Sequence, residues 1–234
     1  MKIPDKLLKT LENEPPGVIQ EVKKGLLRQE LEADLFVLGK YLGYKDMVWS
    51  THKEIIQALT SDTKRKLIVV PRNCFKSTIA VVLYSIWSLL RNPNEAIFID
   101  SEVYENSKNF LREIKAHMEN PRLTKIYGEF KTKTWNEGEI IIKQRNKHRK
   151  EASITCGGIG TVKVGQHYSI MIFDDYNSPN NSNTPEKCQK IIDHYKYNLN
   201  ILDTNGTCVI IGTRYSENDL IGWVLRDQLE EKEL

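Results

Sequence analysis

Six short runs of apolar, largely β-branched residues recur along the chain from residue 67 onward, and helical patterns separate most of them. Strands this apolar are typical of a sheet buried on both faces, and helices between them indicate crossovers around a largely parallel sheet. Between the third and fourth runs there is no room for a helix, so an antiparallel excursion is expected there. The sequence therefore predicts an α/β fold with a mostly parallel central sheet flanked by helices. The runs are LIVV at 67–70, AIFI at 96–99, EIII at 139–142, SITC at 153–156, SIMIF at 169–173 and TCVII at 207–211.

Both ends of the chain show helical patterns. In the first 60 residues, apolar side chains recur every three or four positions, and the segment PPG at 15–17 separates two such stretches. Near the other end, Ser216 and Glu217 form a helix start signal, so a closing helix is expected from there. The length of 234 residues fits one large domain with a small appendage. We expect a helical prefix or lid over residues 1–45 and one main domain over 46–234.

Charge and cysteine usage exclude several classes of protein. The chain has 34 Lys and Arg against 31 Asp and Glu, so its net charge of +3 does not by itself indicate a nucleic-acid partner. The 4 cysteines lie far apart, without the spacing of a zinc site or a disulfide scaffold. The longest apolar stretch, at 79–90, is shorter than the roughly 20 residues of a spanning helix, and the charged N-terminus is unlike a signal peptide. We expect a soluble, cytoplasmic protein without a membrane partner.

The first chemical motif is PRNCFKST at 71–78, which lies between an apolar strand pattern and a long apolar helix pattern. Its Lys-Ser pair has the spacing of the phosphate loop G-x-x-x-x-G-K-[ST], in which backbone N–H groups, the lysine and the hydroxyl hold phosphates and magnesium. Both glycines are missing, and a coincidental strand, Lys-Ser and helix is the alternative. The candidate nucleotide-binding residues are Arg72, Asn73, Cys74, Phe75, Lys76, Ser77 and Thr78.

A second motif, SIMIFDDYN, is an apolar strand that ends in two adjacent carboxylates. At the end of a strand both can face the ligand edge of the sheet, with Asp174 in the magnesium shell and Asp175 as the base that orients water. The alternative is a pair of carboxylates that caps a turn. The combination with a Lys-Ser loop favours the catalytic interpretation, in which Lys76 reaches the phosphates and Asp175 orients the attacking water.

A third motif, CVIIGTRYSENDL, is another apolar strand, and it ends in Gly212, Thr213 and Arg214. A small polar residue at this place can sense the terminal phosphate, and the arginine can neutralise developing charge. These three residues are therefore candidates for coupling hydrolysis to movement. A β-turn with a solvated arginine is the alternative.

The densest basic run lies at 143–150, between the third and fourth strand patterns. It can contact DNA phosphates, which supply most sequence-independent affinity for DNA, or it can be a solvated hairpin tip. The sequence alone leaves both interpretations open. The candidate DNA contacts are Lys143, Arg145, Lys147, Arg149 and Lys150.

In this order along the chain, the motifs resemble the N-terminal ATPase domain of phage terminase large subunits, the DNA-packaging motors. The resemblance rests on PRNCFKST as Walker A, IMIFDD as Walker B, the upstream stretch CGGIGTVKVGQHY and the strand end GTRY, over about residues 50–225. It implies a P-loop NTPase fold of the additional-strand (ASCE) type. It also implies Mg²⁺-dependent ATP hydrolysis by a homo-oligomeric ring, with a monomer left open for the isolated domain. The expected partners are double-stranded DNA, the portal protein and the terminase small subunit, in the host cytoplasm and transiently at the procapsid portal.

By position, the resemblance assigns the β- and γ-phosphates to Lys76, the γ-phosphate also to Arg72, and coupling to the pair at 212–213. Ser77 would hold magnesium directly and Asp174 would hold it through water, while Asp175 would orient the attacking water. The family usually has glutamate at this last place. Phe75 departs from the usual glycine, so weak nucleotide affinity is expected. His52 lies roughly where the family contacts adenine, although an ordinary amphipathic helix is the alternative.

The resemblance therefore implies an ATP-hydrolysing motor domain that moves double-stranded DNA into a procapsid. One alternative is another P-loop translocase of the helicase kind, and a second is a degenerate P-loop module that binds without turnover. Terminase large subunits normally continue into an RNase H-like nuclease domain. Too few residues follow GTRY for such a domain, so DNA cleavage by this chain is not expected.

Overall fold

The computed structural model describes residues 15–161, 163 and 165–230, and it contains a six-stranded sheet of order β1-β6-β5-β2-β4-β3. All neighbouring strands are parallel except β3 and β4, which are antiparallel. The strands are β1 (Arg65–Val69), β2 (Ile97–Ser101), β3 (Glu139–Ile140), β4 (Ile154–Gly158), β5 (Tyr168–Asp174) and β6 (Leu202–Gly212).

Each of the six apolar runs contributes a strand, and the antiparallel excursion falls at β3 and β4 as expected. The α/β fold with a mostly parallel sheet is therefore confirmed. The largest differences from the runs are in β3, which is only two residues long, and in β6, which begins at Leu202, several residues before the run at 207–211. The extension of β6 is less apolar, and its residues Asp203, Thr204 and Asn205 are half-buried or exposed.

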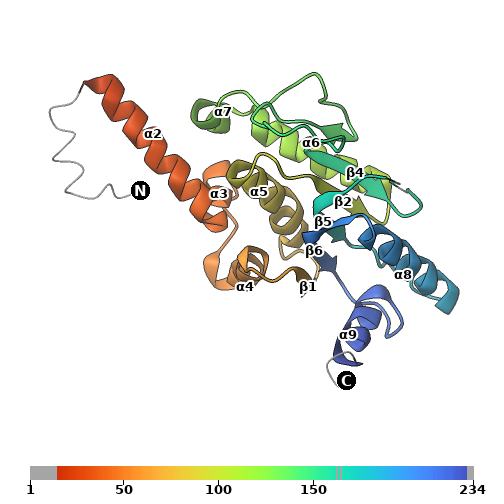
Figure 1. Ribbon diagram of the computed structural model, residues 1–234. Helices are drawn as coiled ribbons and strands as arrows, with labels where there is room; N and C mark the ends of the chain where they lie inside the picture. The colour runs from red at the N-terminus through yellow and green to blue at the C-terminus, as the bar shows by residue number, and fades with distance from the viewer. Residues whose placement is uncertain (1–14, 162, 164, 231–234) are drawn as a thin grey trace.

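Helices cover both faces of the sheet (Figure 1). On one face, α2 to α7 and the π-helical segment η1 pack around a large apolar cluster, and on the other face α8 and α9 pack around a smaller one. The helical segments are α2 (Pro16–Ala33), α3 (Leu35–Leu42), α4 (Trp49–Thr60), η1 (Thr78–Leu83), α5 (Tyr84–Arg91), α6 (Tyr104–Glu119), α7 (Pro121–Tyr127), α8 (Pro185–Leu199) and α9 (Leu220–Glu230).

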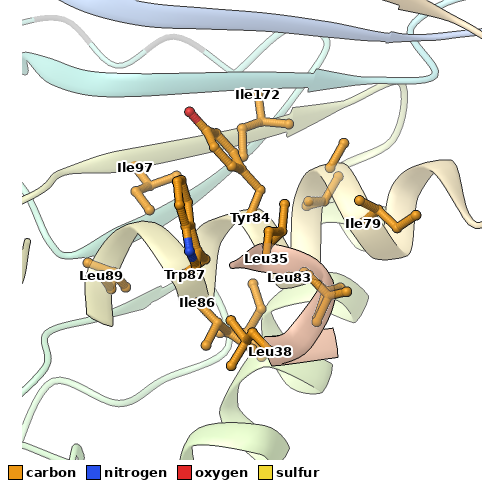
Figure 2. Packing of buried hydrophobic residues seen from close by; sticks show 14 of the residues in the cluster. Leu35, Leu38, Ile79, Leu83, Tyr84, Ile86, Trp87, Leu89, Ile97 and Ile172 are labelled. Atoms are coloured by element: carbon orange, nitrogen blue, oxygen red, sulfur yellow. The ribbon is translucent and has the colours of Figure 1, made fainter. Parts of the chain in front are cut away.

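The helical prefix contributes side chains to the larger cluster. Leu35 and Leu38 of α3 lie against Leu83 and Ile86 from the segment that follows the Lys-Ser loop (Figure 2). Each of these side chains is at most 1% exposed, and burial of one leucine contributes roughly 1.5–3 kcal/mol. The packing is that of a helical cover, while the division of the chain at residue 45 stays a prediction. The first helical stretch of the sequence, before residue 15, lies outside the described residues.

The closing helix begins later than the sequence signal suggested. It starts at Leu220, and Asp219 acts as its cap because its Oδ1 accepts the N–H of Gly222 at 2.9 Å. Oδ2 of the same carboxylate accepts hydrogen bonds from the backbone N–H groups of Tyr215 and Ser216, so Asp219 also stabilises the turn before the helix. The start expected at Ser216 is therefore wrong, because the carboxylate that reaches the helix backbone comes three residues later. Among the described helices, none is both long and apolar enough to cross a membrane.

Candidate functional site

The order of three strands brings the predicted site residues together. β6 lies between β1 and β5, with Val69 paired to Gly212 and Ile211 paired to Asp174. Because these strands are parallel, the residues that follow them meet at the carboxyl edge of the sheet, where ligands bind in open α/β folds. An additional strand between the Lys-Ser loop strand and the acidic strand is the expected ASCE arrangement, which the structure confirms.

The loop before η1 contains left-handed backbone without glycine. Among the described residues, the non-glycine residues with positive φ are Asn73 at 64°, Phe75 at 53° and Asp175 at 42°, and all lie at this edge. Such backbone costs a residue with a side chain roughly 1–2 kcal/mol, and it clusters at functional sites. Phe75 stands where the phosphate-loop pattern has its second glycine. The chain therefore adopts at Phe75 a conformation that glycine would take without strain.

The ring of Phe75 packs beside the loop. It meets the ring of His52 edge-on, with 5.6 Å between ring centroids, and it contacts the larger apolar cluster. His52 is only 4% exposed, and its Nδ1 lies 2.8 Å from the carbonyl oxygen of Val48 at the start of α4. The structure thus places His52 in the packing of an amphipathic helix, and a contact with adenine would need its ring to leave that packing.

Lys76 connects the three parts of the site. Its ammonium group donates hydrogen bonds to Oδ1 of Asp175 and, at 3.2 Å, to Oγ1 of Thr213. Only 7% of Lys76 is exposed, whereas the side chain of Asp175 is 40% exposed. The cation therefore faces the acidic strand and the tip of β6 at the same time, while Asp175 stays accessible to a ligand.

Ser77 and Asp174 form the second contact across the site. The Ser77 hydroxyl donates to Oδ1 of Asp174 at 2.6 Å, and burial raises the pKa of the Asp174 carboxyl to about 7. A hydroxyl and a carboxylate oxygen are the ligand types that Mg²⁺ prefers, usually with phosphate oxygens completing its shell. Within the described ranges there is no group of three or more His, Cys, Asp or Glu residues that could hold a metal. The pair fits Mg²⁺ that is bound jointly with a nucleotide.

The arginines of the two motifs have different partners. The guanidinium of Arg72 donates to the Tyr215 hydroxyl and lies over its ring, 5.6 Å from the centroid. Arg214 instead donates to the carbonyl of Ser216 at 3.3 Å. The motifs assign no role to Tyr215 beyond its place in GTRY, yet it links the Lys-Ser loop to the strand end of the predicted coupling motif. Thr213, by contrast, lies at the site as predicted.

A cavity of about 390 Å³ opens at this edge. All seven predicted nucleotide-binding residues line it, and Asp175 completes the lining. Asp174 and Thr213 lie behind this surface, where they contact Ser77 and Lys76. The structure thus brings the candidate nucleotide, metal and catalytic residues into one site.

The basic run lies at the opposite edge of the sheet. Arg145 donates to the carbonyl oxygens of Glu151 and Glu95, and Arg149 donates to the carbonyl of His167 and to Asp203. These partners precede the strands β2, β4, β5 and β6 or begin them, so the run lies at the amino edge. The two arginines thus make internal contacts. The three lysines of the run, Lys143, Lys147 and Lys150, are exposed. Lys143 also contacts Glu129, and Lys150 also donates to the carbonyl of Gly165.

No protein-family model matches this chain, and no curated protein matches it either. Among solved structures, the HK97 bacteriophage large terminase matches with a TM-score of 0.52 and 14% identity, over 77% of this chain and 36% of that chain. A structure of S. cerevisiae Dbp5 bound to Nup159, Gle1, IP6 and ADP matches with a TM-score of 0.48 and 12% identity, over 84% of this chain and 49% of that chain.

This chain spans about half, or less, of the length of these two matched proteins. At such low identity the likeness to the terminase concerns the fold alone. The chain has the fold of a P-loop NTPase, with a mostly parallel sheet flanked by helices.

Proposed function

We propose that this chain is the ATP-hydrolysing motor domain of a viral DNA-packaging terminase, coupling Mg²⁺-dependent ATP hydrolysis to translocation of double-stranded DNA into a procapsid. The observation that carries the proposal is the convergence of five side chains on one sheet edge. Lys76 contacts Asp175 and Thr213, while Ser77 contacts Asp174. These are the residue types that hold phosphates, magnesium and the attacking water in P-loop hydrolases.

The burial of Asp174 supports a magnesium site. A carboxylate that is only 4% exposed is costly to ionise, which is why its pKa lies near 7. A divalent cation beside it would stabilise the charged form. Ser77 and Asp174 would hold this cation, which would neutralise charge on the phosphates. The buried Asp174 carboxyl group would therefore ionise when a cation binds beside it together with the nucleotide.

The contact between Lys76 and Asp175 suggests how binding prepares catalysis. Phosphate oxygens compete for the Lys76 ammonium, so the lysine would exchange its contact with Asp175 for one with phosphate. The Asp175 carboxylate would then be free to accept a proton or a hydrogen bond from water, as a general base requires. Arg72 would move in the same way from Tyr215 to the terminal phosphate.

Coupling to movement would start at Thr213. Its hydroxyl lies between the Lys76 ammonium and the carbonyl of Val70, at 3.2 and 3.4 Å, so loss of the terminal phosphate would change its hydrogen bonds. We propose that this change reaches bound DNA through a ring of subunits docked on a portal protein, with a terminase small subunit as a further partner. The exposed lysines of the basic run are the proposed DNA contacts.

The test is ATP binding and hydrolysis by the purified chain, with Lys76→Ala beside Lys53→Ala. Lys53 is an exposed lysine of α4, so its replacement controls for the change of charge. We expect Lys76→Ala to abolish Mg²⁺-dependent hydrolysis and Lys53→Ala to leave it unchanged. If Lys76→Ala still hydrolyses ATP at the wild-type rate, the assignment of ATP hydrolysis to this site is wrong.

Two other outcomes would replace the proposal. Hydrolysis that single-stranded but not double-stranded DNA stimulates would favour a helicase-like translocase. Binding without turnover, even with DNA and an assembled ring, would favour a degenerate P-loop module, for which the absence of both loop glycines is the supporting observation.

A further inference from the structure

A buried carboxylate lies on β2, the strand beside the acidic strand β5, and outside the nucleotide site. Asp100 of β2 is fully buried, and its Oδ2 accepts hydrogen bonds from the Tyr176 hydroxyl and, at 3.0 Å, from Nδ2 of Asn198. Nε2 of His194 lies 3.0 Å from the same oxygen. Tyr176 is 3% exposed, and His194 and Asn198 belong to α8. We call these four residues the Asp100 cluster.

Burying the Asp100 carboxyl group in this apolar part of the molecule is energetically unfavourable. Its Oδ1 has no hydrogen-bond partner among the described residues, and burying a carboxylate is unfavourable unless its contacts compensate. The neighbouring strand β4 leaves room for it, because a Cβ added to Gly157 would lie 2.8 Å from Oδ1. The neighbouring side chains Phe98 and Phe173 are apolar. A carboxylate here is best explained by a specific group that it holds.

That group is Tyr176, the residue directly after the acidic pair. The three successive side chains of this turn are held by two different parts of the molecule. Ser77 and Lys76 of the loop hold Asp174 and Asp175, and Asp100 of β2 holds Tyr176. Between them the backbone of Asp175 has the left-handed φ of 42°. Strained backbone of this kind persists only where its surroundings hold it in place.

A second carboxylate supports the chain that follows this turn. Oε1 of Glu102, just beyond β2, accepts from the Ser178 hydroxyl at 2.7 Å and from Nδ2 of Asn181 at 2.9 Å. Nδ2 of Asn181 also donates to the Tyr176 carbonyl at 2.7 Å. The chain after Asp175 is therefore fixed by side chains from the end of β2.

We propose that Asp100 is a positioning residue for Asp175, acting through the Tyr176 hydroxyl. The inference rests on the proposed function, since Asp175 is there the group that orients water. Without the hydrogen bond to Asp100, the Tyr176 ring keeps its apolar contacts, but the backbone before it is free to relax from its left-handed conformation. The Asp175 carboxylate then moves relative to the phosphate loop. Lys76 and Ser77 stay in place, so nucleotide binding is retained.

The test compares Tyr176→Phe with Tyr195→Phe. Both changes remove one hydroxyl from a buried tyrosine whose ring packs on Phe173, at centroid distances of 5.2 and 5.1 Å. The Tyr195 hydroxyl faces Sγ of Cys208 at 3.8 Å instead of Asp100, so it is a matched control. We expect Tyr176→Phe to lower kcat for ATP about tenfold or more, as a small misplacement of a catalytic group does. KM should stay within about twofold, as it does when only transition-state interactions are removed.

Hydrogen exchange gives a readout that does not need turnover. The Asp175 amide donates to the Ile211 carbonyl at 2.9 Å, so the peptide covering 174–177 reports whether the turn is held. Exchange there should be faster in Tyr176→Phe than in wild type, and unchanged in Tyr195→Phe.

The outcomes separate this inference from the proposed function. If wild type shows no Lys76-dependent hydrolysis, the proposed function fails, and the exchange comparison still shows whether Tyr176 holds the turn. If wild type hydrolyses ATP and both phenylalanine variants keep its kcat and its exchange rates, the Asp100 cluster is only structural and the inference is overturned.

Discussion

At Phe75 the loop uses a bulky residue where the common phosphate-loop pattern has glycine. The backbone is left-handed there, and the ring packs on His52 and the main core. The sequence led us to expect weak nucleotide affinity because Phe75 departs from the usual glycine, and this stays a prediction. The structure shows that the loop forms without this glycine, and the contacts of the ring with His52 and the core can offset the cost of the left-handed backbone.

The strain at this residue is open to measurement with Phe75→Gly and Phe75→Ala. Both variants remove the same ring, but only alanine keeps a Cβ in left-handed backbone, at a cost of roughly 1 kcal/mol. We expect the free energy of unfolding of Phe75→Gly to exceed that of Phe75→Ala by about 0.5–1 kcal/mol in urea titrations.

The control pair is Lys53→Gly and Lys53→Ala in the exposed part of α4, where alanine should be the more stable by about 1 kcal/mol. If alanine is also the more stable residue at position 75, the left-handed backbone there is not a source of strain.

Among the helices, the start of α9 depends on one buried carboxylate. Asp219 is fully buried and accepts three backbone N–H groups, whereas Oγ of Ser216 has no partner among the described residues. We expect Asp219→Ala to lower the free energy of unfolding by about 1–2 kcal/mol, the upper range for a helix cap. Ser216→Ala should change it by less than about 0.5 kcal/mol. Equal effects in thermal or urea unfolding would contradict this assignment of the cap.

The strands could be predicted from the sequence because apolar, β-branched runs are a local signal. Their order did not follow from these local patterns, since it depends on pairing between residues far apart, such as Val69 with Gly212; the position of β6 between β1 and β5 was expected only from the family resemblance. The late start of α9 was missed because Ser216 matches the usual start signal and Asp219 acts only through the folded turn. In the same way, Asp100 showed no signal in the sequence, because its partner Tyr176 is distant along the chain.

Most residues that contact one another at the candidate site belong to the three sequence motifs. Their approach could be predicted because the apolar runs mark where the strands end, and the ends of parallel strands meet at one edge of the sheet. These residues are Lys76, Ser77, Asp174 and Asp175. The contact of Arg72 with Tyr215 could not be predicted in this way, since it joins two loops whose approach depends on the sheet order.

Across the molecule as a whole, the nucleotide site and the basic run lie at opposite edges of the sheet. DNA that contacts the run would therefore be far from ATP within one subunit. A structural change at the nucleotide site would have to be transmitted along the strands to reach this DNA. We expect replacement of the three exposed lysines, Lys143, Lys147 and Lys150, by alanine to weaken DNA binding. The salt slope of binding should fall by about 0.9 for each phosphate that the variant no longer neutralises.

Arg145→Ala serves as the comparison, because its internal bonds to the Glu95 and Glu151 carbonyls predict a decrease in stability. Binding and unfolding are measured side by side, in salt titrations and urea titrations. An unchanged salt slope in the lysine variant would assign the run to a solvated loop tip.

Whether these strand ends form an ATP-hydrolysing site is decided by Asp175→Asn. The change removes the proposed base but leaves Lys76, Ser77 and Asp174 in place, so steady-state hydrolysis and ATP affinity should separate. We predict that Asp175→Asn binds Mg²⁺-ATP within about twofold of wild type and loses at least about 99% of turnover, as expected for a general base. Hydrolysis at the wild-type rate by Asp175→Asn would refute the assignment of this site.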